Sequence, residues 1–108
     1  MAGNTILNTT FVVHDSIEAD FLRWLRDVYV PPAMASGAFE SVRVARVLTR
    51  VEPDTSSIAV QFAALSPELC NRWHEGEASA LHADLHSRWA DRLLHFTTFM
   101  EAINLDSI

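Results

Sequence analysis

The sequence predicts a single α+β domain of the ferredoxin-like type, an antiparallel sheet with two helices on one face. Three observations support this: the length of 108 residues, four stretches with strand composition, and two amphipathic segments between them, in the order strand, helix, strand, strand, helix, strand. This order places the first and third strands in the middle of the sheet. We expect one domain over residues 1–108, with an ordered core at about residues 4–103 and a loose tail from Asn104.

Residues 6–14 have the strongest strand pattern. They are rich in β-branched and aromatic residues and carry no acidic or basic charge before His14, as is typical of a strand buried on both faces. Because side chains alternate along a strand, one face is predicted to meet the helices and the other to form a pocket or a subunit interface. The first face carries Leu7, Thr9, Phe11 and Val13, and the second carries Ile6, Asn8, Thr10 and Val12.

A helix is predicted at residues 16–29, because Asp15 and Glu18 have the spacing of a capping box and apolar residues follow at helical intervals. Pro31 and Pro32 should interrupt it, since proline lacks an amide donor, and a short helical appendix should follow to residue 36. Gly37 then ends the segment.

The remaining elements are a hairpin, a second helix and a closing strand. Residues 42–51 and 58–64 are the predicted hairpin strands, joined by a loop rich in Pro, Asp and Ser. The second helix starts at Ser66 and Pro67, is broken or bent at Gly76, and continues past His82 and His86. Residues 93–103 form the closing strand.

The sheet face opposite the helices is predicted to be too apolar to stay exposed to water. On the expected alternation it carries Ile6, Asn8, Thr10, Val12, Val44, Arg46, Leu48, Gln61, Leu93, His95, Thr97 and Phe99. A symmetric homodimer packed sheet to sheet would bury this face and enclose its polar members in a cavity. The predicted ligand-binding residues are therefore Asn8, Thr10, Arg46, Gln61, His95 and Thr97.

Composition excludes several classes of partner. The net charge of −6, with fourteen acidic residues against eight arginines, argues against nucleic-acid binding. No apolar run approaches the roughly 18 residues of a membrane span, and no secretory signal is evident. The single Cys70 is in keeping with a reducing compartment, so we expect a cytoplasmic protein.

Histidines are the candidate catalytic residues, together with Asn8. His82 and His86 are four residues apart on a predicted helix and share a face, but no third ligand is evident and we expect no metal. His95 is a candidate general base if it faces the cavity. The alternative is structural: these histidines border an apolar stripe, the polar sheet residues bond to each other across the dimer, and Arg46 pairs with an acid of the partner.

Several short segments follow one another in a familiar order. They are Asn8-Thr9-Thr10-Phe11, Trp24-Leu25, Val30-Pro31, Gly37-Ala38-Phe39, Arg46, Gln61-Phe62, Leu85-His86, Arg88-Trp89 and residues 91–98. In this order the chain resembles a family of short uncharacterised bacterial proteins, a domain of unknown function in the dimeric α+β barrel superfamily. Ala90 stands where we expect glycine in relatives. The resemblance implies the fold and the dimer, and hardly any activity.

That superfamily also contains antibiotic-biosynthesis monooxygenase-like proteins and haem-degrading enzymes. In the haem-degrading members the site consists of an asparagine on the first strand, a tryptophan, and a histidine on the second helix, which Asn8, Trp73 and His82 resemble in type and order. Two functions therefore stay open. One is a dimer without cofactor that binds a small hydrophobic or aromatic ligand or acts as an interaction module; the other is a cofactor-independent monooxygenase-like or haem-degrading enzyme.

Overall fold

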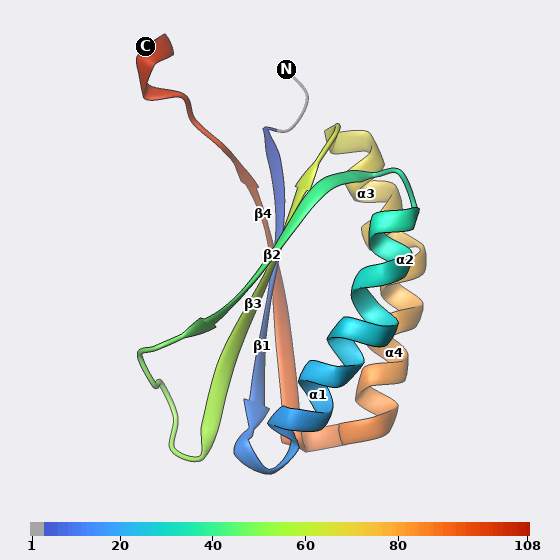
Figure 1. Cartoon of the computed structure of the whole chain (residues 1–108), viewed down its shortest axis with the longest axis vertical. Coiled ribbons are helices and arrows are strands. Elements are labelled where there is room, and N and C mark those ends of the chain that lie inside the picture. The colour runs from blue at the N-terminus through green and yellow to red at the C-terminus, as the bar shows by residue number, and fades with distance from the viewer. Residues whose placement is uncertain (1–3) are drawn as a thin grey trace.

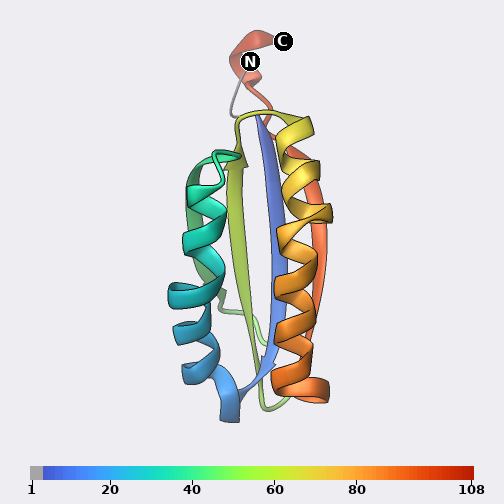
Figure 2. The same ribbon diagram turned by 90° about the vertical axis from the view of Figure 1, so that its right-hand side faces the viewer.

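The computed structural model describes residues 4–108. Its four strands and two helical segments follow one another in the predicted order. The strands are β1 (Thr5–His14), β2 (Phe39–Val47), β3 (Thr55–Ala64) and β4 (Leu93–Glu101). They form one antiparallel sheet in the order β2-β3-β1-β4, so the central positions predicted for the first and third strands are confirmed. All helices cover one face (Figures 1 and 2), and the ferredoxin-like fold is confirmed.

The first helical segment is continuous, and the predicted interruption at Pro31 and Pro32 is wrong. A 3₁₀ turn (Asp15–Ile17) leads into α1 (Glu18–Trp24), a π-helical turn (Leu25–Tyr29) and α2 (Val30–Ala35). The wider π turn makes room for proline rings that would otherwise clash with carbonyl groups one α-helical turn earlier. Gly37 ends the segment with a φ of 81°, as predicted.

The second helical segment follows the prediction closely. The Ser66 hydroxyl accepts a hydrogen bond from the Leu69 amide at 3.2 Å and starts α3 (Pro67–Glu75). Gly76 separates α3 from α4 (Glu77–Trp89). A 3₁₀ turn (Ala90–Arg92) then leads into β4. Within residues 4–108 no helix is long and apolar enough to cross a membrane.

The hydrophobic core lies between the sheet and the helices. Leu7, Thr9, Phe11 and Val13 of β1 are all buried there, so the predicted faces of this strand are confirmed. The Phe11 ring lies 5.0 Å from that of Phe21 between centroids and 5.7 Å from that of Tyr29. Burial of such rings supplies most of the free energy that holds the helices on the sheet.

Residues 102–108 leave the end of β4 on the side of the sheet away from the helices (Figure 1). The Ala102 amide donates to the Asn4 carbonyl at 2.7 Å, which ties the start of this segment to the sheet. The segment contains a 3₁₀ turn (Leu105–Ser107), in which the Asn104 side chain accepts from the Asp106 amide at 3.0 Å.

Ala90 offers a direct test of backbone strain. Its φ of 47° and ψ of −120° lie in a region that favours glycine, the residue expected there from the resemblance. We expect Ala90→Gly to raise the free energy of unfolding by about 1 kcal/mol in urea titrations. The matched control Ala83→Gly, at an exposed position inside α4, should lower it by about 1 kcal/mol. A loss of stability in both variants would contradict the strain at Ala90.

Candidate functional site

No layer formed by residues 4–108 covers the face of the sheet away from the helices, and we call it the open face (Figures 1 and 2). Cross-strand pairing assigns its members, because residues opposite each other in a ladder point to the same side. The central strands contribute Ile6, Asn8, Thr10, Val12, Ser57, Ala59, Gln61 and Ala63. The edge strands contribute Arg43, Ala45, Val47, Leu94, Phe96, Thr98 and Met100.

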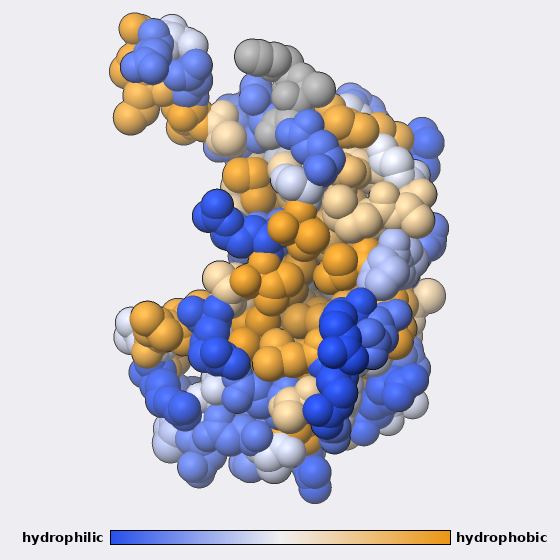
Figure 3. Space-filling view, viewed as in Figure 1, coloured by the Kyte–Doolittle hydropathy of each residue, from blue (hydrophilic) through white to orange (hydrophobic). Residues whose placement is uncertain are grey.

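An apolar hollow of about 410 Å³ lies on the open face, at the end of the sheet where β1 finishes and β4 begins. Figure 3 shows that the outline of the molecule is concave on this side. Its lining is mostly aliphatic and aromatic, and two residues with hydroxyl groups and one with a carboxylate are also part of it. The lining residues are Thr10, Val12, Val47, Val51, Glu52, Ser57, Leu94 and Phe96.

Three of the six predicted ligand-binding residues lie on the open face. Asn8 and Gln61 are directly opposite each other on β1 and β3, and Asn8 Nδ2 donates to Thr10 Oγ1 at 3.3 Å. Asn8, Thr10 and Gln61 therefore form a polar strip, and Thr10 also lines the hollow. The hydrogen bond between Asn8 and Thr10 holds these side chains in place beside the apolar surface.

The other three, Arg46, His95 and Thr97, lie on the helix side, so their predicted position is wrong. Arg46 is opposite buried Ile58 and pairs with Glu18 of its own chain at 2.9 Å, not with a partner. The Thr97 and Thr9 hydroxyls are 3.1 Å apart. Val44, Leu93 and Phe99 are misplaced in the same way, because β2 and β4 have the opposite alternation to the one predicted, and Leu48 lies beyond the end of β2.

The hollow includes residues that the sequence analysis did not select. Val47, Leu94 and Phe96 were assigned to the helix side, and Val51, Glu52 and Ser57 belong to or border the hairpin turn. The position of Ser57 could have been predicted, because it is four residues before Gln61 on β3 and residues an even number apart on a strand share a face. For β4 no such signal exists, because both of its faces carry large apolar residues.

Three histidines and a tyrosine form a cluster between α4 and β4. The His82 Nε2 atom is 3.0 Å from the Tyr29 hydroxyl, and His86 Nε2 is 2.9 Å from His95 Nδ1. The His82 and His95 rings are in contact, with centroids 4.3 Å apart. Burial lowers the pKa of His82 to about 4, and repulsion from neighbouring histidines contributes less. The same two causes lower the pKa of His95. Burial raises the pKa of Tyr29 to about 12.

Within this cluster His82 is a buried, hydrogen-bonded group and does not lie in an open catalytic site. His82 is only 8% exposed, and it lines neither the hollow on the open face nor the hollow between the helices formed by residues 18–24 and 77–89. Among residues 4–108, no three His, Cys, Asp or Glu side chains converge as metal ligands would. His95 faces the helices, so it cannot act as a general base on the open face of its own chain.

Asn8, Trp73 and His82 resemble the site residues of haem-degrading enzymes in type and order, but the geometry does not support a shared site. Asn8 is on the open face, whereas Trp73 and His82 are buried in the helical layer on the other side of the sheet. The three side chains therefore cannot contact one ligand within a single chain. Cys70 is also buried in this layer, and burial raises the pKa of its thiol, which disfavours the nucleophilic thiolate.

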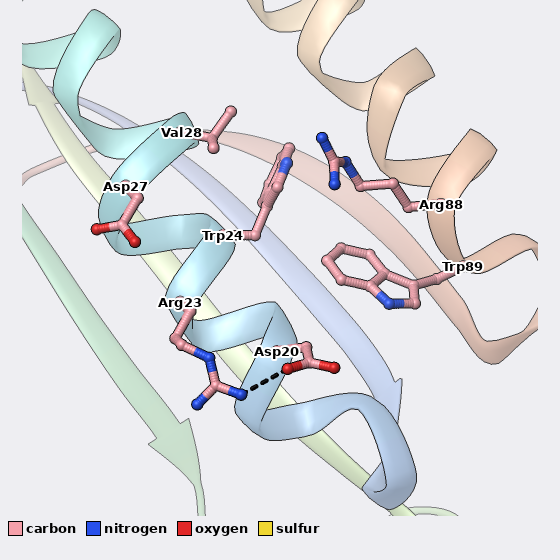
Figure 4. A pocket seen from close by; sticks show the side chains of 7 residues that line it. All are labelled: Asp20, Arg23, Trp24, Asp27, Val28, Arg88 and Trp89. Atoms are coloured by element: carbon pink, nitrogen blue, oxygen red, sulfur yellow. Dashed lines mark hydrogen bonds and ion pairs between the residues drawn. The ribbon is translucent and has the colours of Figure 1, made fainter.

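A second hollow, of about 470 Å³, lies between α1 and α4 on the outer surface of the helices (Figure 4). Trp24 and Trp89 form its wall, with ring centroids 6.2 Å apart. Its charged groups already have partners: Arg23 pairs with Asp20, and Arg88 donates to Asp84 at 2.9 Å. The arginines of this hollow are already paired with carboxylates of the same chain, so the open face is the better candidate for a ligand.

Residues 4–103 match the profile of a family described as "Domain of unknown function (DUF4286)". No curated protein sequence gives a significant match.

Solved structures of similar fold cover nearly the whole chain. HapK from Hahella chejuensis has 14% identity and a TM-score of 0.67 over 94% of this chain and 93% of its own. A dimeric ferredoxin-like protein from an uncultured marine organism has 13% identity and a TM-score of 0.63 over 92% and 95%. A candidate antibiotic biosynthesis monooxygenase from Bacillus cereus has 16% identity and a TM-score of 0.56 over 94% and 98%. At these identities the likeness shows the fold alone.

The lowered pKa of His82 predicts a loss of stability in acid. Between pH 6.5 and 4 the unfolded chain takes up a proton at His82 that the folded chain does not accept, so the free energy of unfolding falls as the pH drops, by up to about 3 kcal/mol. His95 contributes in the same direction. Urea titrations from pH 4 to pH 8 measure this slope.

His82→Gln is the informative variant, because it keeps a hydrogen-bonding partner for Tyr29 and removes the titration. We expect the slope to become clearly shallower in this variant. Ser87→Gln, at an exposed position on α4, introduces the same side chain without removing a titrating group and should leave the slope as it is in the parent protein. An identical slope in the parent and in His82→Gln would rule out the assigned role of His82.

Proposed function

The chain belongs to the DUF4286 family, and we propose that this member is a homodimer that binds a small apolar or aromatic ligand between the open faces of its two sheets. The observation that carries the proposal is the apolar hollow on a sheet face that the described part of the chain, residues 4–108, leaves uncovered. Its volume of about 410 Å³ is within the usual range for small-molecule sites.

The apolar character of the open face supports pairing of two copies. Phe96 is 54% exposed and Leu94 is 56% exposed, and both lie beside the hollow. Large side chains of this kind, grouped on one surface, favour burial against a partner. Two of the solved structures of similar fold are described as dimeric ferredoxin-like proteins, one of them with a TM-score of 0.63. A closed two-fold pair would bury the same face of both copies.

The polar groups on the open face define the chemistry of the ligand. The Thr10 and Ser57 hydroxyls and the Glu52 carboxylate border an otherwise apolar lining. A planar aromatic compound with one or two hydroxyl or amine groups would match this arrangement, since apolar contacts supply affinity and a few hydrogen bonds supply orientation. The lone buried thiol of Cys70 favours a reducing cytoplasmic location for this dimer.

Binding without catalysis fits the open face better than an oxygenase-like reaction. A cofactor-independent oxygenase needs a proton acceptor beside its substrate, and the candidates His82 and His95 lie on the other side of the sheet. The Asn8, Thr10 and Gln61 strip can orient a ligand but supplies no group that titrates near neutral pH. Oxygen uptake with a polyphenol substrate would favour the oxygenase alternative.

Phe96→Asp tests the dimer and the ligand site together. A carboxylate at this position would be buried without a partner in a sheet-to-sheet pair, so we expect light scattering to report a monomer where the parent is a dimer. The fluorescence of bound 1-anilinonaphthalene-8-sulfonate, used as an apolar probe, should fall at least about tenfold when the hollow loses its aromatic wall.

Val28→Asp is the matched control. Val28 is also a partly exposed apolar residue, but it lies on the outer surface of the helices (Figure 4). It should leave both the dimer and probe binding intact. A monomeric parent protein, or a dimer that is lost in Val28→Asp and kept in Phe96→Asp, would contradict the proposal. Native mass spectrometry of the purified protein would report a retained ligand directly.

A further inference from the structure

Residues 102–108, which we call the arm, carry apolar side chains that contact no hydrophobic core. Ile103 is 71% exposed, Leu105 is 73% exposed and Ile108 is 96% exposed. Leu105 and Ile108 are three residues apart at a 3₁₀ turn, where positions i and i+3 point to the same side. The Asn104 cap holds this turn in place. The arm therefore presents an ordered apolar knob that its own chain leaves uncovered.

The arm lies on the same side of the sheet as the open face. In Figure 1 it leaves β4 away from the helices, and in Figure 3 it overhangs one end of the concave surface. The hairpin end between β2 and β3 overhangs the other end, and there Leu48 and Val51 are also largely exposed. Two apolar projections thus flank one apolar concave face.

The arm and the hollow of one chain lie at opposite ends of the sheet. The arm begins after Glu101, which pairs with Thr5 at the start of β1, whereas Leu94, opposite Val12, lines the hollow near the end of β1. Leu94 and Glu101 are seven residue steps apart, which corresponds to about 23 Å of strand. An arm that points away from the sheet cannot cover the hollow of its own chain.

We infer that the arm is exchanged in the dimer, so that Leu105 and Ile108 of each copy pack over the hollow of the other and close its ligand chamber. This rests on the sheet-to-sheet pairing proposed above. When two open faces meet about a two-fold axis perpendicular to the strands, opposite ends of the two sheets come together. Each arm then stands over the hollow of the other copy, and each chamber contains residues from both copies.

Intermolecular disulfide formation tests the placement of the arm. Affinity-tagged Leu105→Cys is co-expressed with untagged Ser57→Cys, a position that lines the hollow, and the purified protein is oxidised. We expect a disulfide-linked pair of tagged and untagged chains. The matched partner is Ala63→Cys, which lies on the same face of β3 at the other end of the sheet. It should give no linked pair, and Cys70 is too deeply buried to compete.

Arm variants measure the contribution of the knob to pairing. Leu105→Asp should raise the dimer dissociation constant at least about tenfold, as expected when a largely exposed leucine becomes buried in an interface. Ser107→Asp adds a charge to the same turn without removing an apolar group and should change the constant by less than about threefold.

The outcomes separate the arm from the dimer. A dimeric parent protein that links through Ala63→Cys, or through neither position, would overturn the exchange and leave the sheet-to-sheet pairing standing. Equal dissociation constants for Leu105→Asp and the parent would do the same. A monomeric parent protein in light scattering would overturn the pairing and, with it, the exchange.

Discussion

Every layer of this protein depends on β1, which hydrogen-bonds to β3 on one side and to β4 on the other. Its alternating side chains divide the molecule in two. Leu7, Phe11 and Val13 hold the helices in place, and Asn8, Thr10 and Val12 form the floor of the open face. The helices bury one face of the sheet and leave the other without a partner. The proposed dimer and ligand chamber both follow from this one-sided arrangement.

The order of elements and the faces of the central strands could be predicted from the sequence. On β1 and β3 every second residue belongs to a mainly apolar set, which is buried, and the residues between them form a set of mixed polarity. The edge strands gave no such signal. Arginines occur on both parities of β2, at Arg43 and Arg46, and large apolar residues occur on both parities of β4. Edge strands are half exposed on each face, so composition does not distinguish their two sides.

The candidate site was predicted in part for the same reason. Asn8, Thr10 and Gln61 lie on central strands and were placed correctly, whereas Arg46, His95 and Thr97 lie on edge strands and were not. The contact of His82 with Tyr29 joins residues 53 positions apart and depends on how the helices pack. The continuous helix through Pro31 depends on a π turn, for which the local sequence has no marker.

The alternation along β1 and β3 also separates positions where a substitution affects the core from positions where it affects only the surface. Along each strand, residues that hold the core together alternate with residues on the open face. A substitution on the open face, such as at Ser57 or Ala59, changes the exposed surface without opening a cavity in the core. Such a scaffold can acquire new binding specificities by single mutations while its folded state is preserved, which suits it to divergence.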